Sequence, residues 1–138
     1  QHRVGMNQSA RILIVDDDPF GTQLLITLLG FEGYQGFRPD ELANPLASVE
    51  QHRPDLVIMD VRLRSLDGVA LLQQLRSLPD PDVATTPVLM MSAEDHRRRC
   101  QLAGANGFIE KPFDRSMLLA TIEQILEGSL SRSETDRQ

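Results

Sequence analysis

The chain has 138 residues and a formal net charge of −6 at pH 7, with 41% hydrophobic and 25% charged residues. This length suits one domain with a hydrophobic core, and the acidic balance argues against a nucleic-acid-binding domain. No apolar stretch approaches the roughly 20 residues that span a bilayer. The single cysteine, Cys100, excludes an intrachain disulfide and fits a reducing compartment such as the cytoplasm.

Short apolar runs alternate with helical patterns along the chain. Continuous apolar runs of this kind are typical of strands that are buried on both faces of a parallel sheet. We predict five strands, at residues 11–15, 34–37, 56–60, 88–92 and 107–110. Helices are expected between and after them, at residues 20–29, 45–53, 69–78, 97–103 and 115–127. The alternation predicts an α/β fold with a parallel sheet.

The two ends of the chain differ in composition from the segment between them. Residues 1–9 lack the apolar core of a signal peptide and are expected to be an unstructured leader or expression remnant. After Gly128 the sequence is rich in Ser, Arg and Glu, which favours a disordered tail or the start of a linker. The expected domain is therefore residues 10–127. Within it, Asn44 and Asp114 are expected to cap the helices that follow them.

Polar side chains stand at the carboxyl end of four predicted strands. Asp16 and Asp17 follow the first strand, Asp60 ends the third, Ser92 ends the fourth and Lys111 follows the fifth. Ligands bind beyond the carboxyl ends of the strands in an open parallel sheet. We therefore expect these groups to converge on one site, suited to a divalent cation and a phosphoryl group.

Each residue type has a chemical reason to be there. Carboxylates are hard ligands that suit Mg²⁺, and a carboxylate such as Asp60 can carry a phosphoryl group as an acyl phosphate. Ser92 offers a hydroxyl, Ala93 leaves space, and Lys111 can bind a phosphate oxygen as a point charge. Taken singly, each has an ordinary structural interpretation, as a cap, a strand end or a surface charge. The combination favours the functional one.

In this order the motifs resemble the receiver domain of two-component response regulators, similar to chemotaxis-type single receivers. The resemblance covers about residues 10–127. It rests on the segments at residues 12–19, 54–60, 66–68, 91–93, 103–105 and 111–114. It implies a flavodoxin-like, doubly wound sheet of five parallel strands in the order 2-1-3-4-5, with helices on both faces.

The resemblance also implies roles for the site residues. Asp60 would accept a phosphoryl group from a phosphohistidine of a histidine kinase or phosphotransfer protein. Asp16, Asp17, Asp60 and the backbone carbonyl of Arg62 would hold Mg²⁺, with Mn²⁺ as a substitute. Catalytic chemistry would be limited to self-phosphorylation and self-dephosphorylation, so the protein would be a signalling phosphoacceptor rather than an enzyme.

The switch would lie next to this site. Ser92 and Lys111 would bind the phosphoryl oxygens, and Phe108 matches the aromatic residue that turns inward when Ser92 moves. A cis bond before Pro112 would aim Lys111 into the site. The output would act on a downstream protein or a missing effector domain. A homodimer through the fourth helix, fifth strand and fifth helix is a further expectation, without direct contact to nucleic acid or membrane.

Some positions depart from the family pattern. Arg62 lies two residues after Asp60, Glu94 lies two after Ser92, and Arg64 replaces a common proline. We hypothesise that Arg62 and Glu94 pair over the site and slow water attack, the alternative being two solvated side chains. The segment between Ser92 and Lys111 is short, which predicts a short or irregular fourth helix.

Residues 97–99 form a basic run in that fourth helix. A solvated surface is its first interpretation, and docking of an acidic partner is its second. The three histidines, at positions 2, 52 and 96, show no metal-ligand spacing and are expected on the surface. Cys100 is expected to be a small buried helix residue.

Two alternative functions use the same residues. A phosphatase of the haloacid-dehalogenase type would need a Thr or Val where Phe20 follows the acidic segment, and a longer chain for its cap. A receiver-like binding module that is never phosphorylated would usually lack an acidic residue or the lysine, and both are present.

Overall fold

A computed structural model describes residues 10–137, with side chains described as far as residue 129. The predicted leader at residues 1–9 lies outside the described residues. All five strands are parallel and form one sheet in the order β2-β1-β3-β4-β5, which confirms the predicted flavodoxin-like topology. The strands are β1 (Arg11–Val15), β2 (Gln35–Phe37), β3 (Leu56–Asp60), β4 (Val88–Ser92) and β5 (Gly107–Glu110).

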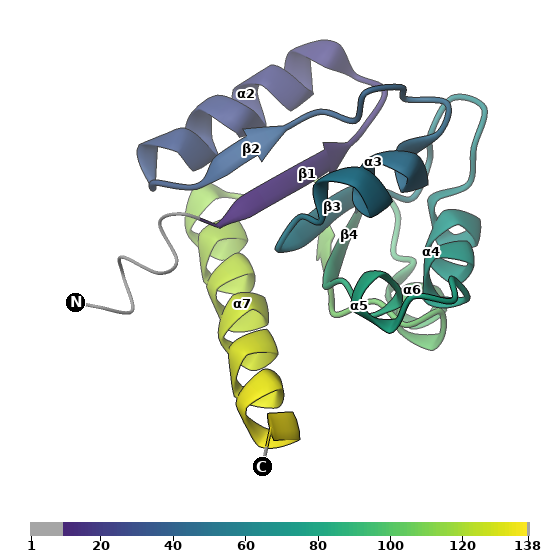
Figure 1. Cartoon of the computed structure of the whole chain (residues 1–138). Coiled ribbons are helices and arrows are strands. Elements are labelled where there is room, and N and C mark those ends of the chain that lie inside the picture. The colour runs from purple at the N-terminus through teal and green to yellow at the C-terminus, as the bar shows by residue number, and fades with distance from the viewer. Residues whose placement is uncertain (1–9, 138) are drawn as a thin grey trace.

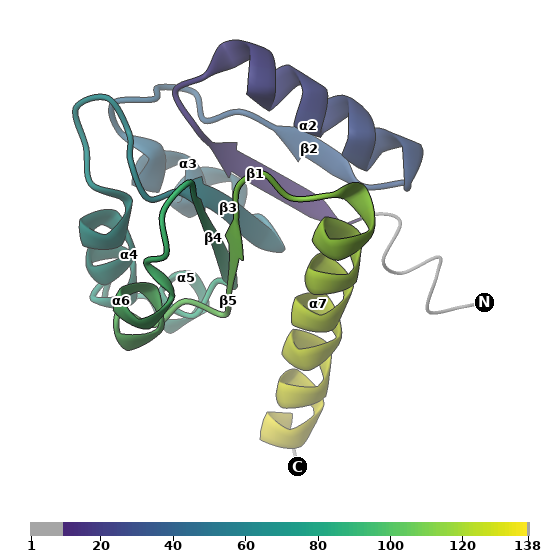
Figure 2. The same cartoon turned by 180° about the vertical axis from the view of Figure 1, so that it is seen from behind.

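Helices cover both faces of this sheet. They are α2 (Pro19–Phe31), α3 (Pro45–His52), α4 (Gly68–Arg76), α5 (Pro81–Ala84), α6 (Arg97–Leu102) and α7 (Arg115–Arg137). Figures 1 and 2 show α2 and α7 on one face of the sheet and the other helices on the opposite face. The site residues predicted at the strand ends thus lie at the carboxyl edge of a sheet whose two faces are both covered by helices.

The core has two halves because successive strand residues point to opposite faces. The half under α3 to α6 is built from residues including Leu13, Val57, Met59, Met90 and Cys100. The half under α2 and α7 is built from residues including Ile12, Ile58, Leu89, Leu118 and Ile122. Cys100 is fully buried, as expected. The central strands β3 and β4 are therefore buried at every residue, because both of their faces are covered.

Aspartate side chains begin several of the helices. The carboxylates of Asp18 and Asp67 accept hydrogen bonds from the backbone N–H groups of Phe20 and Val69. The predicted cap at Asp114 is confirmed, since its Oδ1 accepts from the Met117 N–H at 2.8 Å. Asn44 occupies the expected cap position, but the expected side-chain bond is absent. The backbone N–H of Asn44 instead closes a turn onto the Glu41 carbonyl, and Pro45 starts the helix.

Two helical segments differ from the sequence prediction. No helix was predicted between residues 78 and 88, yet α5 forms there because Asp80 caps it and Pro81 stands in its first turn.

The second difference lies after Gly128, where a disordered tail or the start of a linker was predicted. Helix α7 continues through Gly128 to Arg137. One glycine costs a helix only about 1 kcal/mol, while each added residue gains a backbone hydrogen bond. The C-terminal part of α7, yellow in Figure 1, projects beyond the sheet.

Helix α6 has six residues, which confirms the predicted short helix between Ser92 and Lys111. Between residues 10 and 137, no helix is both long enough and apolar enough to cross a membrane.

Candidate functional site

Asp60 lies at the end of the central strand β3, between β1 and β4, and its side chain is almost fully buried. Both carboxylate oxygens are engaged. Oδ2 lies 2.5 Å from the Nζ of Lys111, and Oδ1 accepts a hydrogen bond from the backbone N–H of Arg62 at 2.9 Å. A buried carboxylate held in this way has a fixed direction and a nearby cation, as an acceptor of a phosphoryl group requires.

Asp16 follows β1 and reaches the same lysine. Its Oδ2 lies 3.6 Å from the Nζ of Lys111, and its Oδ1 accepts from the Asp18 N–H at 3.1 Å. Burial, aided by the negative charges of Asp60 and Asp17, raises the pKa of Asp16 despite the hydrogen bond from Asp18 and the charge of Lys111. Negative charge at this position is therefore incompletely neutralised.

Lys111 is held between these two carboxylates. Burial acts to lower the pKa of Lys111, but the hydrogen bonds and charges of Asp60 and Asp16 outweigh it and raise the pKa above its ordinary value. The peptide bond between Lys111 and Pro112 is cis, as expected. The backbone N–H of Lys111 also donates to the carbonyl of Ser92 at 2.8 Å, so the ends of β4 and β5 are joined at the site.

Asp17 pairs with a different cation. Its Oδ2 lies 3.9 Å from the Nε of Arg64. Among residues 10–137, no three His, Cys, Asp or Glu side chains are gathered closely enough to hold a metal ion. The predicted metal ligands Asp16 and Asp60 are thus brought together by Lys111, whereas Asp17 is not. Their chemistry still fits a hard divalent cation, because both are carboxylates that offer oxygen ligands.

Ser92 ends β4 and is buried, with 2% of its surface exposed. Its Oγ accepts a hydrogen bond from the backbone N–H of Glu94 at 3.1 Å. Ala93 is exposed and lines a groove together with Asp16 and Lys111. Ser92, Ala93 and Lys111, which were expected to border a phosphoryl group, therefore lie together at the ends of β4 and β5.

Phe108, the predicted switch aromatic, lies on β5 and is half-buried against the core half under α3 to α6. The guanidinium of Arg97 lies over its ring, 5.1 Å from the centroid. Arg97, Arg98 and Arg99 are all exposed, which confirms the predicted solvated basic surface. Two of them also have partners, since the Nη2 of Arg99 lies 2.7 Å from the Oδ2 of Asp67. These contacts arise because α6 packs beside β5 and the loop after β3, which sequence spacing does not reveal.

A family model of the response regulator receiver domain matches residues 12–123. The chain belongs to this family. Receiver domains are signalling phosphoacceptors rather than enzymes, and they generally bind Mg²⁺ at the phosphorylation site.

Individual relatives agree with this assignment. The chain is 32% identical to protein PilH of Pseudomonas aeruginosa over 122 residues, covering 86% of this chain and 99% of PilH. It is 37% identical to response regulator MprA of Mycobacterium leprae over 119 residues, 84% of this chain but 50% of MprA. The solved structure of the chemotaxis response regulator CheY4 of Vibrio cholerae has a TM-score of 0.76 and 27% identity, covering 85% of this chain and 98% of CheY4. The chain therefore spans nearly all of PilH and about half of MprA.

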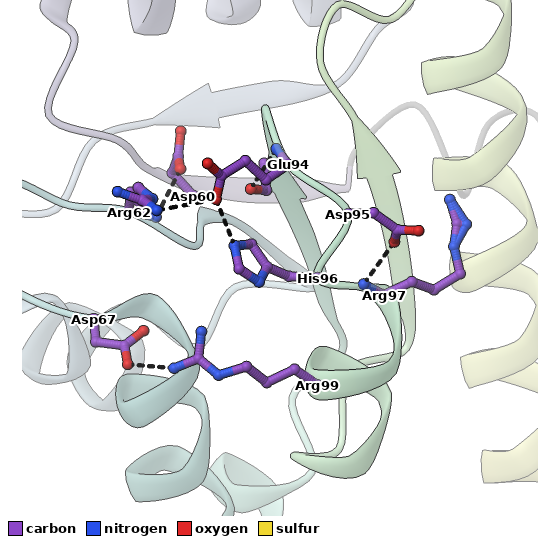
Figure 3. A network of polar contacts seen from close by, with 9 residues as sticks. Asp60, Arg62, Asp67, Glu94, Asp95, His96, Arg97 and Arg99 are labelled. Carbon is purple, nitrogen blue, oxygen red and sulfur yellow. Dashed lines mark hydrogen bonds and ion pairs between the residues drawn. The ribbon is translucent and has the colours of Figure 1, made fainter.

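The receiver domain also contains the ion pair hypothesised at its departures from the family pattern. The Nη2 of Arg62 lies 2.9 Å from the Oε1 of Glu94, and the Nε2 of His96 lies 3.2 Å from the same oxygen (Figure 3). Hydrogen bonding and attraction to Arg62, followed by His96, lower the pKa of Glu94. The presence of this pair is confirmed, while its effect on water attack stays a hypothesis. His52 pairs with Asp40 at 3.0 Å, and His2 lies outside the described residues.

An apolar groove of about 740 Å³ runs between α2 and the start of α7 in this receiver domain. Leu24, Leu25, Leu28, Phe113 and Leu118 line it, and it reaches the site at Asp16 and Lys111. The exposure of Leu24 is thus part of a larger apolar surface. The groove depends on how α7 lies relative to α2, which leaves Leu24 exposed.

Proposed function

We propose that this receiver domain is a phospho-accepting switch in which Asp60 takes a phosphoryl group from a phosphohistidine. A carboxylate oxygen of Asp60 attacks the phosphorus, the P–N bond breaks as the P–O bond forms, and the electron pair stays on the histidine nitrogen, which takes up a proton. The observation that carries this proposal is the contact of Lys111 with the buried carboxylate of Asp60.

The other site residues have roles in the same step. The ammonium group of Lys111 would shift its contact from the Asp60 carboxylate to a phosphoryl oxygen. The Ser92 hydroxyl would donate a hydrogen bond to another phosphoryl oxygen. Asp16, Asp17, Asp60 and the Arg62 carbonyl would hold Mg²⁺, or Mn²⁺ in its place, after the Asp17 side chain turns from Arg64. When bound, the cation would neutralise charge on the transferring phosphoryl group.

Phosphorylation would then change the surface on the far side of Ser92. If the Ser92 hydroxyl moves toward the phosphoryl group, it leaves the Glu94 N–H and opens space beside Phe108. Phe108 would turn inward and leave the Arg97 guanidinium. The switch would thus alter α6, β5 and α7, a surface that also offers the exposed Leu102 for a homodimer.

The partners follow from the two sides of the site. A histidine kinase or phosphotransfer protein would dock on the apolar groove between α2 and α7, because that surface leads to Asp16 and Lys111. The phosphorylated form would act on a downstream protein or an effector domain. A cytoplasmic location fits the single buried cysteine.

The test is the intact mass of the protein after incubation with Mg²⁺ and acetyl phosphate. We expect a gain of one phosphoryl group, and no gain in Asp60→Asn or without Mg²⁺. Asp55→Asn is a matched control, because Asp55 lies at the opposite end of β3 and binds the Arg11 N–H. No gain in the wild type, together with no effect of Mg²⁺ on the melting temperature, would instead favour a binding module that works without phosphorylation.

A further inference from the structure

The loop that follows β3, residues 61–67, is closed on itself. Arg62 and Asp67 form an isolated antiparallel bridge, and the backbone N–H of Gly68 donates to the Val61 carbonyl at 2.7 Å. Leu63 and Leu66 exchange backbone hydrogen bonds at 3.1 and 3.4 Å. Arg62 and Asp67 are therefore fixed side by side at the base of one short loop.

A basic residue, Arg62, and an acidic residue, Asp67, lie at the two ends of this loop. Each forms an ion pair with a residue that follows β4 in the chain. Arg62 contacts Glu94 at 2.9 Å, and Asp67 contacts Arg99 on α6 at 2.7 Å. Figure 3 shows both pairs crossing from the β3 side to the β4 side. We call the Arg62–Glu94 and Asp67–Arg99 pairs together the clasp.

The clasp is exposed, so its value for the stability of the fold is small. The side chains of Arg62 and Glu94 are 74% and 60% exposed, and those of Arg99 and Asp67 are 49% and 46% exposed. Exposed ion pairs contribute little to folding and weaken with added salt. Two pairs attached to one closed loop nevertheless restrict where that loop lies relative to Asp60.

Asp67 has separate functions for its two oxygens. Oδ1 accepts the N–H of Val69 at 3.0 Å and caps α4, while Oδ2 binds Arg99. Asparagine at this position would keep the capping oxygen but lose the charge. The chain thus allows the ion pair to be removed without removing the helix cap.

We propose that Asp67 and Arg99 are positioning residues that act through Arg62 on the lifetime of the phosphoryl group on Asp60. The Arg99 contact holds the closed loop, the loop holds the backbone and side chain of Arg62, and the Arg62 N–H in turn binds Asp60. Occupation of Arg99 by a partner at α6 would then change the rate at which phospho-Asp60 loses its phosphoryl group. This inference rests on the proposed function.

The experiment compares the half-life of the acetyl-phosphate-labelled protein in several variants, followed by intact mass. Arg99→Gln and Asp67→Asn are each expected to shorten the half-life about two- to fivefold, because loosening of Arg62 admits water. Added salt should shorten the wild-type half-life toward the Arg99→Gln value. Arg98→Gln is the matched control, since Arg98 is exposed and no side-chain partner is seen for it among residues 10–129.

A second pair of variants tests whether the effect passes through Arg62. In an Arg62→Ala background, Arg99→Gln should have no additional effect on the half-life. An equal effect in both backgrounds, or a half-life of Arg99→Gln equal to that of Arg98→Gln, would overturn the inference while leaving phosphorylation of Asp60 intact. Absence of any label on the wild type would overturn the proposed function instead, and the inference with it.

Discussion

The Nζ of Lys111 lies 2.5 Å from the Oδ2 of Asp60 and 3.6 Å from the Oδ2 of Asp16, and so occupies the space between two predicted metal ligands. The lysine therefore does two opposing things. Its charge stabilises the two carboxylates, and we expect it to compete with a divalent cation for their oxygens. This relationship makes a prediction about metal affinity that is separate from phosphorylation.

Replacing Lys111 with Met should strengthen Mg²⁺ binding by about three- to tenfold, because one positive charge next to both carboxylates is lost. Titration calorimetry of Mg²⁺ measures this directly. The same variant should take up the phosphoryl group at least about tenfold more slowly, because the lysine ammonium group no longer stabilises the negative charge on the phosphoryl oxygens. Unchanged or weaker Mg²⁺ binding would contradict the competition, and Arg98→Met serves as a control for charge elsewhere.

The Arg62–Glu94 pair predicts a slow loss of the phosphoryl group. Glu94→Ala should shorten the half-life of the phosphorylated protein several-fold, since Arg62 would no longer be held over the site at 2.9 Å. Asp95→Ala is a suitable comparison, because Asp95 is the next residue and its carboxylate binds only the backbone N–H of Arg97 among the described contacts. Equal half-lives for the wild type and Glu94→Ala would disprove the hypothesis.

Asp16 predicts a dependence of stability on pH. Its pKa is raised in the folded state, so the folded protein binds a proton at Asp16 more readily than the unfolded chain does. At a pH above this raised pKa, where Asp16 is ionised in both states, its buried charge opposes folding. As the pH falls through the raised pKa toward the ordinary value of 3.8, this penalty disappears.

Asp16→Asn should therefore raise the midpoint of urea unfolding near neutral pH, in the absence of Mg²⁺. The gain should shrink as the pH falls through the raised pKa of Asp16, because the wild type then becomes protonated at the same position. Asp18→Asn controls for the general loss of an acidic residue near the site while keeping an oxygen to cap α2. A gain that does not change with pH would show that desolvation of Asp16 is not its cause.

We predict that position 68 tolerates only glycine, because there is no space for a Cβ. A Cβ at this position would overlap the carbonyl oxygen of Asp60, a backbone atom that cannot move without moving the site. Gly68→Ala should cost about 3 kcal/mol or more in the free energy of unfolding and should weaken Mg²⁺ binding.

Gly30 provides the matched control for that substitution. It lies within α2, and a Cβ there meets nothing within 4 Å. Gly30→Ala should stabilise the protein by up to about 1 kcal/mol, because alanine favours the helix. Chemical denaturation of both variants gives the comparison, and a Gly68→Ala protein as stable as the wild type would contradict the predicted overlap.

Much of the fold could be predicted from local patterns. Strands β3 and β4 were predicted with their observed bounds, because each is a continuous apolar run ended by a polar residue. The parallel arrangement explains why Asp60 and Ser92 then stand at the same edge of the sheet. The sequence also indicated the Arg62–Glu94 pair, because both residues lie two positions beyond neighbouring strand ends.

Contacts between distant segments could not be predicted in the same way. The bond between Arg99 and Asp67 and the stacking of Arg97 on Phe108 both depend on how α6 lies against β5 and the loop after β3. The direction of Asp17 toward Arg64 and the open side of α2 at Leu24 likewise depend on neighbouring loops and helices. The sequence by itself determined which groups reach the carboxyl edge of the sheet, because strand direction and side-chain period are local. Only the tertiary structure decided which of those groups touch, because that depends on packing between segments that the chain brings together from far apart.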